Sequence, residues 1–156
     1  MVSFATVGAA WLVHSVITDS LDRADGGLLR LNLLFLFFVS LLPFPTRMIG
    51  EYLHSESAER IAVTVYGINL LAIAALNSVL WRYAVFERLV TTDIPEEDVH
   101  AITAKIAPSL ALYGGAILIG LLAPTAAVFL YFAIALFLLI PFRTLLHHVR
   151  RRSDRD

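Results

Sequence analysis

The polar side chains most able to do chemistry lie in otherwise apolar stretches, beginning with Trp11 and His14. Residues three apart share one face of an α-helix, so these two rings can reach the same neighbour. An imidazole can donate, accept or carry a proton near neutral pH, which favours a hydrogen-bonding or proton-sensing station in a helix bundle. The alternative, an interfacial Trp and His near the end of a short helix, stays open.

Asparagines form the second group of polar residues in apolar surroundings. Asn32 lies in one apolar stretch, and Asn69 and Asn77 lie in a later one that also holds Tyr66. Polar side chains inside membrane helices hydrogen-bond to neighbouring helices, at about 1 kcal/mol per bond. We therefore interpret these residues as interhelical contacts, and a functional role for Asn32 stays open.

The residue types do not indicate an enzyme or a resident metal. The chain has no cysteine, and neither paired carboxylates nor a Ser, His and Asp set falls on one expected helix face. His54, near Glu51 and Glu56, is a weak metal signal. His147-His148 adjoin a run of arginines, which is typical of a solvated helix end. We expect no catalytic residue, no cofactor and no metal site.

Composition indicates the elements that must hold these side chains. The 156 residues are 58% hydrophobic and 16% charged, with a mean hydropathy of +0.76. A soluble domain is roughly 45–50% apolar and about 25% charged. We therefore predict an all-α polytopic membrane helix bundle, because backbone polar groups in lipid must be paired internally. The net charge of −1 argues against a nucleic-acid partner.

Five apolar stretches have nearly the length of about 20 residues that a helix needs to cross a membrane. Ala123-Pro124 leaves room only for a tight hairpin between the last two, and the small pairs Ala111/Gly115 and Ala116/Gly120 permit close helix approach. We expect a transmembrane helical domain over residues 1–149 and a basic tail over 150–156, with spans at about 1–17, 28–49, 61–81, 106–122 and 125–146.

Prolines and capping residues predict where these helices bend and start. Pro43 and Pro45 remove two backbone donors and should bend or end the second span. Asp93, followed three residues later by a glutamate, has the pattern of a capping box. We expect a helix from about Ile94 that runs into the fourth span and bends at Pro108.

Basic residues predict the orientation. Placing the arginine-rich tail in the cytoplasm puts ten of the twelve basic residues inside, as the positive-inside rule requires. Only Arg47 and Arg60 then lie outside. With five spans, Met1 falls on the external side without a basic flank, so we expect one further helix upstream.

Four short segments carry a resemblance to a known family: Trp11–His14, Leu31–Leu36, Leu41–Thr46 and Gly50–Tyr52. In this order they resemble the second and third helices of the transmembrane protein 175 family. These proteins are potassium channels of endosomes and lysosomes, with single-repeat relatives in bacteria and archaea. Residues 32 to 52 are the most specific part, and the remaining helices match in layout only.

The resemblance implies that the five helices are the second to sixth of a six-helix repeat, four of which form a homotetramer. In this family the first helix carries an Arg-x-x-x-Phe-Ser-Asp signature and lines the pore. No Phe-Ser-Asp occurs in this chain, so the pore-lining residues are expected on a helix absent from it. Trp11, His14 and Asn32 match positions that support this signature by hydrogen bonding.

The resemblance implies a subunit of a potassium-permeable channel, with K+ as the permeant ion and a passive mechanism. The expected setting is the lipid bilayer of a prokaryotic plasma membrane, with the C-terminus cytoplasmic. One alternative is a non-conducting truncated or accessory membrane protein that lacks the pore-lining helix. A small transporter or an intramembrane enzyme using His14 is the least favoured interpretation.

Overall fold

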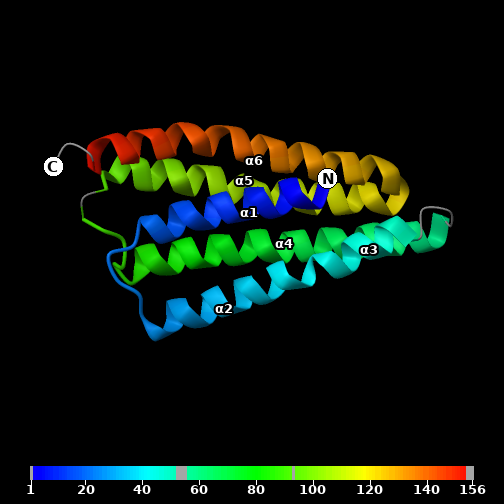
Figure 1. Ribbon diagram of the computed structural model, residues 1–156, viewed down its shortest axis with the longest axis horizontal. Helices are drawn as coiled ribbons and strands as arrows, with labels where there is room; N and C mark the ends of the chain where they lie inside the picture. The colour runs from blue at the N-terminus through cyan, green and yellow to red at the C-terminus, as the bar shows by residue number, and fades with distance from the viewer. Residues whose placement is uncertain (1, 52–55, 93, 154–156) are drawn as a thin grey trace.

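The computed structural model describes residues 2–51, 56–92 and 94–153. Within that part the secondary structure is helical apart from an isolated bridge between Leu21 and Val90. The all-α bundle predicted from composition is therefore confirmed. Its helices, shown in Figure 1, are α1 (Val2–Asp19), α2 (Gly26–Leu41), α3 (Pro43–Glu51), α4 (Glu56–Phe86), α5 (Glu96–Leu122) and α6 (Pro124–Ser153).

Helix α4 forms the centre of the bundle. It contacts each of the other described helices, and in Figure 1 it lies between α2 and α5. Its buried side chains include Tyr66 and Trp81, which are among the largest fully buried residues of the protein. Helices α5 and α6 form the expected hairpin through Ala123, and α1 packs on α6 and α4.

Large apolar side chains cover the outer surface of the bundle. Phe4, Leu33, Phe37, Leu118 and Phe129 are all exposed. Such a surface suits lipid tails, which are as apolar as these side chains. Over the described residues, three helical segments are long and apolar enough to cross a membrane, and a shorter apolar helix covers 124–138. The three are 26–51, 57–86 and 99–122.

Helices α2 and α3 form one nearly continuous helical segment that is interrupted at Leu42. The backbone of Leu42 is still helical, with φ −52° and ψ −39°, and its N–H donates to the Val39 carbonyl. The N–H of Thr46 then donates to the Leu42 carbonyl at 3.2 Å. Pro43 and Pro45 therefore interrupt the predicted second span without ending it.

Helix α5 begins two residues later than the sequence predicted. Pro95 is its N-cap residue, with φ −58° and ψ 146° and no side-chain capping bond. Because this backbone is extended, the helix can start only at Glu96. The expected capping residue, Asp93, lies outside the described residues. Pro108 lies inside α5 without ending it.

The α1–α2 and α4–α5 connections are joined at one end of the bundle. The N–H of Asp22 donates to the Leu89 carbonyl at 3.0 Å. Arg88 has φ 53°, and the N–H of Leu89 donates to the Ala84 carbonyl at 2.9 Å. This is the Schellman pattern that closes a helix C-terminus. The α1–α2 connection is therefore held against the end of α4. A groove opens beside it, between α1 and α2.

Candidate functional site between helices α1 and α2

A groove of about 300 Å³ lies between α1, α2 and the connection that joins them. His14 of α1 and Asn32 of α2 line it, and Leu80 of α4 contributes to its wall. The exposed residues Asp22 and Arg23 lie at its mouth. The groove thus brings together two of the three residues that the sequence predicted as a hydrogen-bond support network.

His14 is held by aromatic packing. Its ring stacks on Phe35 of α2, with centroids 4.3 Å apart and planes inclined by 13°. The residue is only 6% exposed, and its Nδ1 atom has no hydrogen-bond partner among the described residues. The Asn77 side chain of α4 also interacts with it. His14 is therefore oriented by its neighbours while one of its ring nitrogens remains available.

Asn32 presents a second available polar atom. Its Oδ1 is buried and has no hydrogen-bond partner within the described part of the chain. Buried polar atoms are paired in the large majority of cases, so an unpaired one calls for an explanation. The groove therefore contains an imidazole nitrogen and an amide oxygen that can both accept a hydrogen bond from a polar group brought to it.

Trp11 lies beside the groove rather than in it. Its side chain is 59% exposed, and its ring centroid is 6.1 Å from that of His14. The shared helix face expected from their spacing is present. No hydrogen bond joins Trp11, His14 and Asn32 to one another in the described structure, and their role as supports stays a prediction.

Interhelical hydrogen bonds hold the bundle around the groove. Asn69 donates to the Phe38 carbonyl of α2 at 3.2 Å, in agreement with its interpretation as an interhelical contact. Trp81 donates from Nε1 to Thr103 Oγ1 of α5 at 2.8 Å. The Trp81 bond and the packing of Phe35 have no signal in the sequence, because both depend on how two helices face each other.

Asp25 is the charged group best fixed near the groove. Its Oδ1 accepts from the Leu28 N–H at 2.7 Å, and its Oδ2 accepts from the Tyr83 hydroxyl at 2.7 Å. These bonds hold the pKa of Asp25 below its ordinary value. The Leu28 bond has the largest effect, and the Tyr83 bond the next largest. Asp25 thus caps α2 and ties it to α4, a role that its sequence position alone did not reveal.

The described residues contain no group of three or more His, Asp and Glu side chains placed to hold a metal ion. His54, the residue of the weak metal signal, lies outside the described part of the chain. The side chains of His147 and His148 are likewise not described. The groove between α1 and α2 is therefore the candidate site that the structure supports.

The helical bundle with an apolar outer surface defines a multi-pass membrane protein. Residues 1–43 match the family model of the endosomal/lysosomal potassium channel TMEM175. A crystal structure described as a lysosomal potassium-selective channel TMEM175 homolog from Chamaesiphon minutus matches with a TM-score of 0.80. That match has 30% identity and covers 90% of this chain and 70% of the other. The chain belongs to the TMEM175 family.

Two curated relatives are potassium channels. That of Streptomyces collinus is 37% identical over 81 residues, which are 52% of this chain and 39% of that protein. That of Chamaesiphon minutus is 35% identical over 106 residues, which are 67% of this chain and 52% of that protein. The chain therefore spans about half or less of the length of these relatives.

Proposed function

We propose that the protein containing this chain is a subunit of a potassium-permeable channel, through which K+ moves passively down its gradient. The observation that carries this is the match over 90% of the chain to a structure described as a potassium-selective channel. A channel lowers the barrier for an ion by lining a path with suitable groups and needs no catalytic residue. The function is therefore that of a channel and not of an enzyme.

Within this channel, we assign the groove between α1 and α2 to bracing rather than to conduction. His14 Nδ1 and Asn32 Oδ1 are buried without partners among the described residues. Leaving such an atom unpaired costs about 1–3 kcal/mol. A polar group from another helix of the assembled channel would remove that cost, with Trp11 packing beside it. The pore-lining residues then lie on a different surface from this groove.

The proposed setting is a prokaryotic plasma membrane, with four subunits around one axis. Residues 1–149 form the transmembrane domain, in which α1 and α6 cross the bilayer as well as the three longer segments. The segment 150–156, which carries four arginines, is a cytoplasmic tail, because positive charge is retained on the cytoplasmic side.

A flux assay on the full-length gene product tests this function. The purified protein is reconstituted into KCl-loaded liposomes that are diluted into NaCl, and K+ efflux is followed with a voltage-sensitive dye. Efflux faster than from protein-free liposomes supports the channel. Liposomes carrying a folded, tetrameric protein with no efflux above that background would support the alternative, a non-conducting accessory membrane protein.

A further inference from the structure

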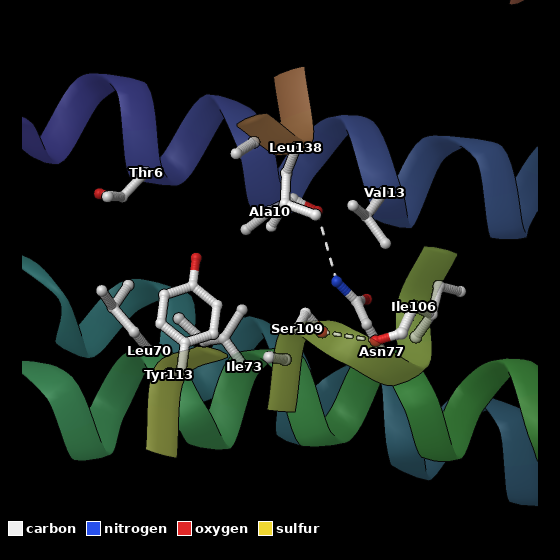
Figure 2. Close-up of a pocket in the computed structure, with 12 residues that line it drawn as sticks. Thr6, Ala10, Val13, Leu70, Ile73, Asn77, Ile106, Ser109, Tyr113 and Leu138 are labelled. Atoms are coloured by element: carbon white, nitrogen blue, oxygen red, sulfur yellow. Dashed lines mark hydrogen bonds between the residues drawn. The ribbon is translucent and has the colours of Figure 1, made fainter. Parts of the chain in front are cut away.

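We propose that a cavity among α1, α4, α5 and α6 binds one or two internal water molecules that hydrogen-bond to Asn77. The cavity is shown in Figure 2. Ala10 and Val13 of α1, Asn77 of α4, and Ser109 and Tyr113 of α5 contribute to its wall. Its lining residues are separate from those of the groove, although Asn77 also interacts with His14.

The size of the cavity suits water. Its volume is about 30 Å³, and a cavity needs about 10–15 Å³ of such volume to hold one water molecule. There is thus room for one or two waters and too little for a lipid chain or a larger solute. An apolar cavity of this size would stay empty, so occupancy depends on the polar groups in its wall.

Asn77 supplies the polar end of the cavity. It is only 3% exposed. Its side chain interacts with His14, but its Oδ1 has no geometrically formed hydrogen bond among the described residues. Its Nδ2 donates to the Ala10 carbonyl at 3.5 Å, which is at the long limit for such a bond. Figure 2 shows this amide reaching from α4 toward α1. A water donating to Oδ1 would complete its hydrogen bonding.

Two hydroxyls of α5 supply the further partners that a buried water requires. Ser109 Oγ donates to the Ile106 carbonyl at 2.6 Å, which leaves its lone pairs free to accept. Tyr113 is 5% exposed, and Figure 2 shows its hydroxyl pointing from α5 toward α1. A buried water commonly makes about three hydrogen bonds. Asn77 and Ser109 toward one end of the cavity, and Tyr113 toward the other, offer such partners to the one or two waters for which there is room.

Asn69 is a matched control on the same helix. It is also buried, its amide N–H also donates to a backbone carbonyl of another helix, and its Oδ1 also has no partner in the described structure. It does not line the cavity. Asn69→Leu and Asn77→Leu therefore remove the same groups from the same helix. Only Asn77→Leu also removes access to the proposed water and the interaction with His14.

A structure of the full-length protein at a resolution that reveals buried waters tests the site. We expect one or two density peaks within hydrogen-bond distance of Asn77 Oδ1, absent in Asn77→Leu and retained in Asn69→Leu. Where Asn77→Leu fails to fold, Tyr113→Phe removes one partner at nearly constant volume, and the peak nearest to that ring should lose occupancy. A cavity that is dry while other buried waters are visible, or a peak unchanged in Tyr113→Phe, would overturn the assignment.

Discussion

Two buried polar atoms, one in His14 and one in Asn32, distinguish these residues from side chains that only fill space in the bundle. His14 stacks on Phe35, yet its Nδ1 and the Oδ1 of Asn32 have no partners among the described residues. A buried apolar side chain could pack on Phe35 equally well without leaving a polar atom unpaired. The proposed bracing role would pair the imidazole and the amide with polar groups in the assembled protein.

The proposed bracing role predicts the outcome of substituting His14 or Asn32. In the full-length protein, His14→Ala and Asn32→Ala should each lower stability by about 0.6–2 kcal/mol, the range for an intramembrane hydrogen bond. The ratio of K+ to Na+ permeability should change little. Thermal denaturation in detergent and bi-ionic flux measure the two effects. Altered ion discrimination with unchanged stability would place these residues on the pore instead.

Asp25 predicts a specific response to acid. Its pKa lies below the ordinary value because the Leu28 N–H and the Tyr83 hydroxyl donate to its carboxylate. Its contribution to stability is therefore complete above the unfolded pKa, about 3.9, and is lost as pH falls through the lower pKa of the folded state.

The measurement is the melting temperature of wild type and Asp25→Asn between about pH 6 and pH 2.5, a window spanning that pKa. An amide still caps a helix but does not titrate. Below about pH 4, around the ordinary carboxyl pKa, the wild-type melting temperature should fall more steeply than that of the variant. Parallel curves would show that the carboxylate contributes nothing that depends on its charge.

Close helix approach at Gly67 predicts a large effect of one methyl group. A Cβ at this position would collide with the Tyr131 hydroxyl of α6 and with Ile117 of α5. Gly67→Ala should therefore lower stability by about 1–3 kcal/mol, as overpacking usually does. Gly115→Ala is the control, because nothing lies within 4 Å of its Cβ. It should be neutral or stabilising by up to about 1 kcal/mol. Equal effects of the two changes would argue against this contact.

Apolar stretches and prolines in the sequence predicted where the helices lie, but they did not predict which helix faces contact each other. The pairs Ala111/Gly115 and Ala116/Gly120 have the same spacing, yet only the second packs closely. A Cβ at Gly120 would lie 3.2 Å from Ala127, whereas Gly115 faces open space. Spacing reveals that two small residues share a face, and the bundle decides which face is covered.

For the candidate site too, the sequence predicted which residues share a helix face but not which residues of other helices they contact. The three-residue spacing placed Trp11 and His14 side by side, and their ring centroids are 6.1 Å apart. The stacking of Phe35 on His14 could not be predicted, because it depends on the rotation of α2 against α1. The start of α5 was missed because Pro95 keeps an extended backbone, and a capping pattern in the sequence does not encode that conformation.

The connections expected in the cytoplasm lie at one end of the bundle. Figure 1 shows the C-terminal end of α6 at the same end as the α1–α2 and α4–α5 connections. A reporter fused after Asp156 should therefore read cytoplasmic, and one inserted between residues 50 and 60 should read external. An external reading at the C-terminus would contradict the orientation derived from the basic residues.

The most direct measurement of the proposed channel is a current recording under bi-ionic conditions. The full-length protein is reconstituted in a planar bilayer with K+ on one side and Na+ on the other at equal concentration. A K+-permeable pore predicts a steady passive current whose reversal potential is displaced from 0 mV in the direction that favours K+. A correctly folded, tetrameric protein that carries no current, or one whose current reverses at 0 mV, would contradict a potassium channel.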